Sequence, residues 1–169
     1  MKAKLIIEDK EIEIEISEEE YKKLQPSEEK KTGYERVAKN GHYFYEFGKG
    51  DVGSDVEDCY DIDDEYYASA NYYSSETVAE NNARADKLMR QLRRFAVEHR
   101  KCGVNLNSTK TEKHYICYDY ESNELESTFT FCVRVFGVIS FDSEETANAA
   151  IDEFHDELIW YFTEYKDSL

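Results

Sequence analysis

The sequence predicts an α+β fold in which antiparallel strands are followed, twice along the chain, by a long helix. Three observations support this class: short runs that alternate apolar and polar residues, turn residues between those runs, and two long segments whose apolar residues are three and four apart. Strand groups that each precede a helix are typical of helices packed on antiparallel sheets. The 169 residues are enough to bury a core without disulfides or metals.

The first 25 residues are expected to form a hairpin and a short helix. Apolar and polar residues alternate between Lys2 and Ile16 on both sides of a polar turn. Ser17 begins a capping-box signature, which predicts a short helix over 17–24. The only proline lies in the polar stretch 25–32, which we interpret as a linker. We therefore expect a separate region over 1–25.

A first strand–helix unit is expected over 33–102. Two aromatic-rich runs are joined by Asn40-Gly41, the strongest short signal for a hairpin, and a further strand is expected within 51–57. Ser74 to Glu76 then cap a helix that continues to about Lys101. The inward stripe of this helix comprises Val78, Ala85, Leu88, Met89, Leu92, Phe95 and Ala96.

A second unit is expected over 110–169. It contains strands over 114–120, 127–136 and 137–141, then a helix from the Ser143 cap to about Tyr165. The segments 71–83 and 138–150 share an aromatic strand end, a serine-rich cap, an acidic first turn and alanines. We interpret this similarity as an internal duplication of a βββα unit. The inward stripe of the second helix comprises Ala147, Ile151, Phe154, Leu158, Phe162 and Tyr165.

The net charge of −17 limits the classes of partner. Residues 50–83 contain ten acidic and no basic residues, whereas 84–113 carry a net charge of +6. Affinity for nucleic acid comes largely from Lys and Arg, so direct DNA binding over a broad face is not expected. The sequence contains no apolar run that could span a membrane and no signal peptide, which predicts a cytoplasmic protein. The four widely spaced cysteines are expected to be reduced and mostly buried.

The stretch 55–73 is the first candidate site, because it holds seven carboxylates and five tyrosines without a basic residue. A calcium loop beginning at Asp61 would place Tyr66 at its glycine position and Tyr72 at its bidentate glutamate position, so the loop template fails. Weak divalent binding, a merely solvated acidic loop and a surface for a basic protein remain open. The candidate partner-binding residues are Asp55, Glu57, Asp58, Asp61, Asp63, Asp64, Glu65, Tyr66 and Tyr67.

The basic face of the first long helix is the second candidate site. It would either neutralise the neighbouring acidic segments or contact nucleic acid. The candidate contact residues are Arg84, Lys87, Arg90, Arg93 and Arg94.

No catalytic motif is recognisable in the sequence. It lacks paired histidines, a nucleophile elbow and a phosphate-binding glycine loop. The carboxylates are too numerous for any pair to be assigned acid–base work. We expect a protein that is not an enzyme and that needs no metal or cofactor.

Two segments resemble a group of small acidic proteins encoded by phages and prophages. The first matching set is Asp61, Asp63, Asp64, Tyr66, Asn71 and Tyr72, and the second is Gly137, Ile139, Phe141, Ser143, Glu144, Glu145 and Ala147. The resemblance covers about residues 33–165, and it departs from the group at Glu65, which replaces a basic residue, and at Tyr73, which replaces Phe. Some proteins of this kind are anti-CRISPRs that disable type II RNA-guided nucleases.

The resemblance implies an inhibitor that acts in the cytoplasm of a bacterial host. Its partner would be a basic nucleoprotein, namely a type II CRISPR nuclease, bound through a surface that mimics DNA. The alternative is a phage accessory or structural protein that contacts nucleic acid through the basic helix 84–101, with a homodimer formed through the helical faces.

Overall fold

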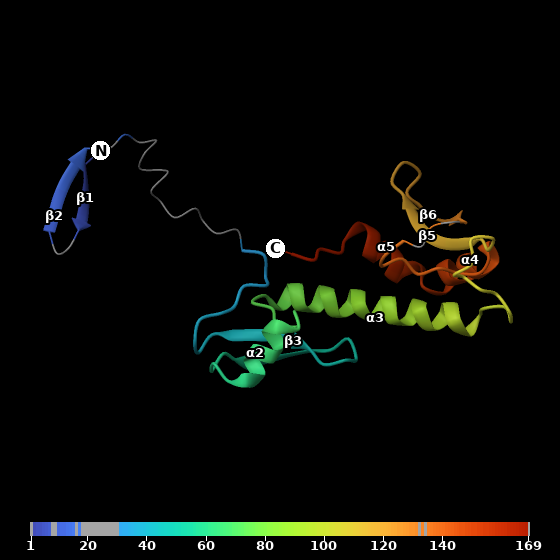
Figure 1. Ribbon diagram of the computed structural model, residues 1–169, viewed down its shortest axis with the longest axis horizontal. Coiled ribbons are helices and arrows are strands. Elements are labelled where there is room, and N and C mark those ends of the chain that lie inside the picture. Colours follow the sequence, from blue (N-terminus) through green and yellow to red (C-terminus); the bar gives the residue numbers. More distant parts are fainter. Residues whose placement is uncertain are drawn as a thin grey trace. The chain divides into compact units, whose positions relative to one another are not determined.

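The described chain contains three antiparallel hairpins, and the second and third are each followed by two helices, which confirms the predicted α+β class (Figure 1). The computed structural model describes residues 2–7, 10–15, 17, 31–131, 133 and 135–168. The chain divides into two compact units, Met1–Lys31 and Thr32–Leu169, with the boundary inside the predicted linker. Both predicted strand–helix units belong to the second compact unit. Residues 18–24 of the predicted short helix lie outside the described residues.

The first unit contains the predicted N-terminal hairpin. Strands β1 (Lys2–Ile7) and β2 (Lys10–Glu15) are antiparallel. Lys2 is opposite Glu15, and Ile7 is opposite Lys10. Ile16, the last apolar residue of the predicted alternation, lies outside the described residues.

The first half of the second unit consists of a hairpin and two helices. Strand β3 (His42–Glu46) pairs antiparallel with β4 (Val52–Val56). Phe44 of β3 also exchanges backbone hydrogen bonds of 2.8 and 2.9 Å with Tyr73. In sequence, helix α2 (Asp61–Ala68) comes after β4 and before Tyr73, and helix α3 (Glu76–Glu98) follows Tyr73.

The second half also consists of a hairpin and two helices, but its bridged residue precedes both helices. Strand β5 (Lys113–Asp119) pairs with β6 (Glu124–Thr130), and His114 of β5 bridges Phe141 through hydrogen bonds of 3.0 and 2.8 Å. Helices α4 (Glu144–Glu153) and α5 (His155–Thr163) follow. The long helix predicted to reach Tyr165 is therefore interrupted at Phe154.

The two halves correspond at their helix starts. Ser75 and Ser143 are N-caps, and each side-chain oxygen accepts a hydrogen bond from the backbone N–H three residues later. Each cap follows its bridged aromatic residue, Tyr73 or Phe141, by two positions. In the structure Ser75 corresponds to Ser143, whereas the sequence segments 71–83 and 138–150 align Glu76 with Ser143. The third predicted strand of the first unit, within 51–57, is the strand β4, whereas the third predicted strand of the second unit, 137–141, is only a single bridge.

One predicted hairpin is wrong. Asn40 adopts a positive φ of 67° in a turn closed by a 2.7 Å hydrogen bond from Gly41 N to Ala38 O. The residues before this turn do not form a strand, and β3 pairs with β4 instead. The segment before the turn is held by side chains, because Arg36 reaches across to Glu57.

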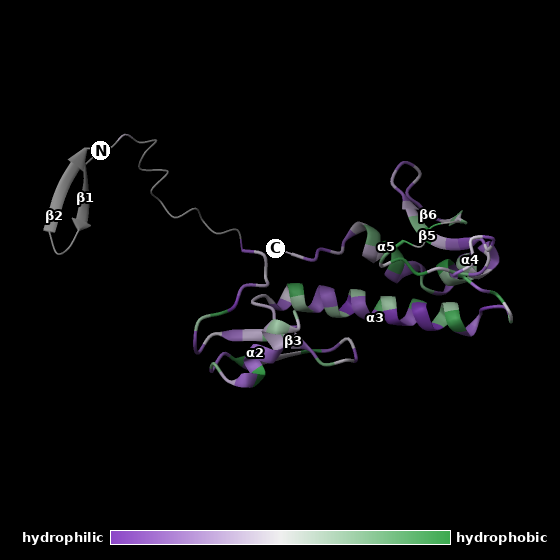
Figure 2. Cartoon of the chain, in the orientation of Figure 1, coloured by the Kyte–Doolittle hydropathy of each residue, from purple (hydrophilic) through white to green (hydrophobic). Residues whose placement is uncertain are grey.

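Helix α3 contributes to two core clusters. Its N-terminal residues Val78 and Ala79 pack with Tyr73 against the β3–β4 hairpin. Figure 2 shows apolar and polar positions alternating along this helix. The predicted stripe is confirmed, although Met89 is only half-buried. The second cluster joins Leu88, Leu92, Phe95 and Ala96 of α3 to Phe141, Ala147, Ala150 and Leu158.

Two further expectations need correction. Strand β6 ends at Thr130 instead of continuing to 136, and the predicted strand 137–141 is limited to the bridge at its last residue.

The cysteines are less buried than expected. Cys59 and Cys102 are exposed free thiols, whereas most cysteines were expected to be buried. Cys132 lies outside the described residues. None of the described helices combines the length and apolar character needed to cross a membrane.

Candidate partner-binding surface

Glu57, directly after β4, is a structural residue of the acidic stretch. Only 1% of its surface is exposed. The Arg36 guanidinium donates two hydrogen bonds to its carboxylate, at 2.8 and 2.9 Å. The Tyr72 hydroxyl and the Cys59 backbone N–H donate two more, at 2.9 and 3.0 Å. A buried carboxylate with four donors is satisfied within the chain, so Glu57 is not available to a partner.

The hydrogen bonds from Arg36 lower the pKa of Glu57 to about 2, although burial opposes this shift. The same interaction raises the pKa of Arg36. The pair therefore stays ionised over the whole physiological range and fixes the segment before β3 against the end of β4.

This depressed pKa predicts a loss of stability in acid. The contribution of Glu57 is fully present above pH 4.5, its ordinary pKa, and is lost as the pH falls toward 2. Urea unfolding between pH 5 and pH 2 should show a smaller loss for Glu57→Gln than for the wild type. Other carboxylates such as Glu35, whose pKa is also lowered to about 2, titrate in both proteins and provide the common background. Identical pH dependence of the two proteins would contradict the assignment.

Asp63 holds the start of α2. Its carboxylate accepts hydrogen bonds from the Tyr43 hydroxyl at 2.9 Å and from the backbone N–H groups of Asp58 and Tyr60 at 3.1 and 3.0 Å. Tyr60 is the N-cap of α2, so Asp63 satisfies N–H groups at the helix start that have no intrahelical partner. Because it is 98% buried, it too is unavailable to a partner.

Stacked tyrosine rings connect strand β3 to helix α2 and to the segment that follows the helix. The rings of Tyr43 and Tyr72 are stacked with centroids 4.2 Å apart, and those of Tyr45 and Tyr66 are stacked at 4.5 Å. Burial raises the pKa of Tyr72 to about 12. Tyr66, a predicted contact residue, is therefore largely committed to packing.

The other residues of the stretch 55–67 are mostly exposed and form an acidic surface. Asp64 pairs with Arg36 at 2.5 Å, whereas the other exposed carboxylates of the stretch form no ion pair with any described residue. Tyr60, Ile62 and Tyr67 are exposed between these carboxylates. We define the acidic surface as Asp55, Asp58, Tyr60, Asp61, Ile62, Glu65 and Tyr67.

The segment that carries this surface was expected to be a loop, but its second half is helix α2. Asp61 and Glu65 are four residues apart on that helix and so lie on one face. Asp63 is buried because it lies at the position of the first turn that reaches back to the N-cap. Three of the predicted contact residues, Glu57, Asp63 and Asp64, are thus engaged within the chain.

Most of the predicted basic face is also engaged. Arg84 pairs with Glu157 at 2.8 Å, and its guanidinium carbon lies 3.9 Å from the centroid of the Trp160 ring. Arg90 pairs with Glu46 of β3 at 2.8 Å. Arg94 lies 3.9 Å from the carboxylate one turn later on the same helix. The helix cations therefore neutralise both acidic halves of the unit.

Two of the five predicted basic residues remain without an ion pair among the described residues, namely Lys87 and Arg93. Lys87 lies beside Gly50, whose φ of +84° and lack of a side chain leave room for the lysine stem. Arg93 is exposed.

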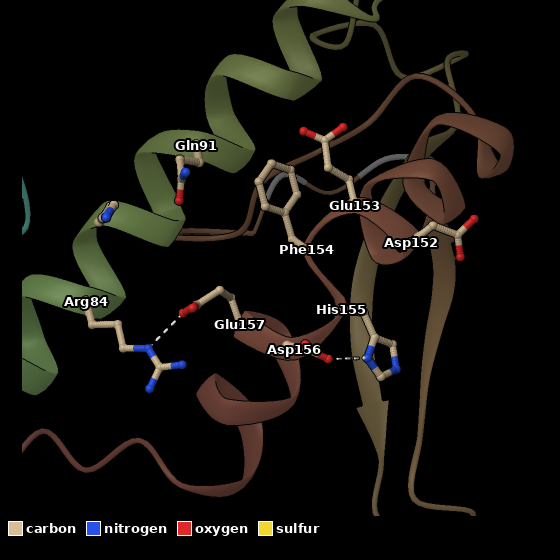
Figure 3. A pocket seen from close by; sticks show the side chains of 9 residues that line it. Arg84, Gln91, Asp152, Glu153, Phe154, His155, Asp156 and Glu157 are labelled. Carbon is tan, nitrogen blue, oxygen red and sulfur yellow. Dashed lines mark hydrogen bonds and ion pairs between the residues drawn. The ribbon is translucent and has the colours of Figure 1, made fainter.

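A cavity of about 700 Å³ lies between α3 and residues 152–157 (Figure 3). Its polar side chains pair locally: Arg84 points to Glu157, and His155 bonds to Asp156 at 3.2 Å. They do not converge on one point, as the polar groups of a small-molecule site do. No group of three or more potential ligands in the described chain is arranged to hold a metal ion.

Sequence reasoning missed Arg36, Tyr60 and Ile62. Arg36 lies before β3, and its partners are 21 and 28 residues away in sequence, so no local pattern reveals the pairs. Tyr60 and Ile62 alternate with the carboxylates and could have been included with Tyr66 and Tyr67. In comparisons with known proteins, no family model, curated protein or solved structure matches this chain.

Proposed function

We propose that the chain is a non-catalytic inhibitor that binds a basic protein surface through its acidic surface. The observation that supports this proposal is the way α2 is held. Buried hydrogen bonds to Asp63 and Glu57 hold the segment in place, while Asp55, Asp58, Asp61 and Glu65 stay exposed and form no ion pair with a described residue. A fixed set of charges needs no ordering on binding, which favours affinity.

The chemistry of the acidic surface suits a partner that normally holds nucleic acid. Its carboxylates present negative charge, and Tyr60, Ile62 and Tyr67 present apolar faces between them. A cationic groove for nucleic acid offers both basic side chains and surfaces on which bases stack. Together with the resemblance to small acidic phage proteins, this favours a type II RNA-guided nuclease in a bacterial host as the target.

A DNA-cleavage assay with a purified type II nuclease tests this function. The protein is added before guide loading, after guide loading, or after target binding. We expect inhibition when it precedes target DNA and little when it follows, because the two compete for one groove. Inhibition should weaken as salt rises from 50 to 500 mM, since screening shortens the range of the charge interaction. Inhibition that is equal at both salt concentrations, or absent in every order, would refute the proposal.

A phage accessory protein that contacts nucleic acid through α3 is the second candidate. The observation that favours it is the two cations that form no ion pair with any described residue, Lys87 and Arg93. A gel shift with duplex DNA that disappears in the Lys87→Ala, Arg93→Ala double variant would support this candidate. A shift that is absent in the wild type would exclude it.

A further inference from the structure

An exposed apolar segment follows β6. The side chains of Phe129, Phe131, Val133 and Val135 recur at every second position, and each is between 41% and 54% exposed. Phe136, next along the chain, is fully exposed. Alternation of this kind is typical of a strand with one buried face, but here nothing in the described chain buries it. We call the described residues of this stretch, 127–131, 133, 135 and 136, the apolar edge segment.

The segment continues from an unpaired sheet edge. Within the described residues, β5 uses one edge to pair with β6 and the other to bridge Phe141 through His114. The outer edge of β6 has no partner strand there. The Lys113 ammonium donates to the carbonyl oxygens of Phe131, Ser108 and Thr111, which anchors the end of this edge. Its remaining outward N–H and C=O groups are able to pair with another strand.

The same end of the sheet contains an unsatisfied buried group. His114 is 94% buried, and its Nδ1 is the only described buried side-chain nitrogen or oxygen without a hydrogen-bond partner. The ring lies beside Phe129, with centroids 5.8 Å apart. Buried polar atoms are rarely left unpaired in a complete structure. The uncovered apolar face and the unpaired nitrogen thus lie together.

An apolar groove adjoins the segment on its C-terminal side. A cavity of about 250 Å³ is lined by Leu88 and Met89 of α3, Leu158 and Phe162 of α5, and Val138, two residues after Phe136. The exposed apolar surface therefore extends beyond the strand edge to the second core cluster. Contiguous apolar surface of this kind marks interaction sites in proteins.

The charge distribution indicates which occupant fits. Residues 127–141 contain no acidic residue and one arginine, although the whole chain carries a net charge of −17. Two copies repel each other over the rest of their surfaces, and their approach costs least where both lack carboxylates. A basic partner would instead be attracted to the acidic surface. The apolar edge segment therefore fits a second copy of this chain.

We propose that two copies pair through their apolar edge segments, antiparallel about a twofold axis. The outer edges of the two β6 strands then join two hairpins into one four-stranded sheet. An antiparallel arrangement is self-complementary, so each copy offers the same residues and the contact closes on itself. Apolar side chains of the two segments then lie next to each other across the join, which removes part of their surface from water. This inference is independent of the proposed inhibitory function.

Sedimentation equilibrium of the full chain tests the dimer. Because Val133 is exposed in the monomer, Val133→Lys should preserve the fold but place a charge at the centre of the contact in each copy. We expect it to weaken dimerisation by at least about 100-fold. Val97→Lys is the matched control, since Val97 is an exposed valine on α3 and its replacement should leave the dimer unchanged. Circular dichroism establishes that both variants are folded, and Val135→Lys replaces Val133→Lys if the latter unfolds.

Salt and amide exchange give two further readouts. Raising salt should strengthen the dimer, because it screens repulsion between two chains of net charge −17, whereas it should weaken binding of a basic partner. Amides within 127–136 should become more protected from hydrogen exchange as the protein concentration rises. A chain that stays monomeric at 100 µM and high salt would overturn the inference. A dimer that resists both lysine variants or leaves 127–136 unprotected would also overturn it.

Discussion

Asp63→Ala is expected to destabilise the second unit by about 3 kcal/mol. The change removes the acceptor of the Tyr43 hydroxyl, and a buried polar group left unpaired costs about 1–3 kcal/mol. It also removes the carboxylate that satisfies the Tyr60 N–H at the start of α2, and loss of a helix cap costs about 1 kcal/mol. Urea denaturation followed by circular dichroism measures the difference.

Asp61→Ala is the control for this effect. Asp61 lies two residues earlier in the same helical turn, but it is exposed and forms no ion pair with a described residue. Its replacement should cost no more than about 1 kcal/mol, from the lost interaction with the helix dipole. Equal destabilisation by the two substitutions would contradict the anchoring role of Asp63.

Neutralising the acidic surface is expected to weaken partner binding by about 30- to 100-fold at low salt. The variant combines Asp55→Asn, Asp58→Asn, Asp61→Asn and Glu65→Gln. Exposed ion pairs contribute about 0.2–1 kcal/mol each, so four of them amount to roughly 2–3 kcal/mol. Affinity for the proposed nuclease partner, measured by surface plasmon resonance, should fall mainly through a slower association rate.

A second variant with the same net charge separates position from total charge. It replaces Glu121, Asp152, Glu153 and Glu164, which are exposed carboxylates elsewhere in the second unit, by their amides. Its affinity should stay within about threefold of the wild type, because charges beyond a Debye length are screened. If both variants bind equally weakly, only the overall charge matters and the acidic surface is not the contact.

Local patterns predicted α3 well, but they missed α2 and the interruption of the second long helix at Phe154. The bounds of α3 follow from the Ser75 cap and from the three-and-four spacing of its apolar residues, since both signals come from neighbours in sequence. The turn between β5 and β6 was predicted for the same reason. Asn123 there adopts a positive φ of 60°, which asparagine tolerates.

Long-range partners could not be predicted. The Asn40-Gly41 turn formed, but the competing partner of β3 lay on its other side, and the sequence cannot rank two hairpins that share a strand. The roles of Glu57 and Asp63 were hidden for a related reason. A run of carboxylates does not reveal which of them meets Arg36 or Tyr43 until the chain is folded.

The strand predicted over 127–136 shows a third limit. Alternation of apolar and polar residues predicts that one face of the strand is buried, but it does not indicate whether the same chain or another molecule buries that face. Pairing within the chain supports β6 only to Thr130. The rest of the pattern remains unexplained by the folded monomer, and it supports the contact between two copies that we propose.

The participation of α3 in both core clusters limits how far the protein can be shortened. A fragment that ends near Gly103 would leave Leu88, Leu92 and Phe95 open to water, and a fragment that begins after it would lack half of its own interior. Neither piece could serve as a minimal form of the proposed inhibitor, even though the exposed carboxylates of the acidic surface occupy a stretch of about a dozen residues. Any miniaturised version or transplanted epitope has to keep residues 32–169 together.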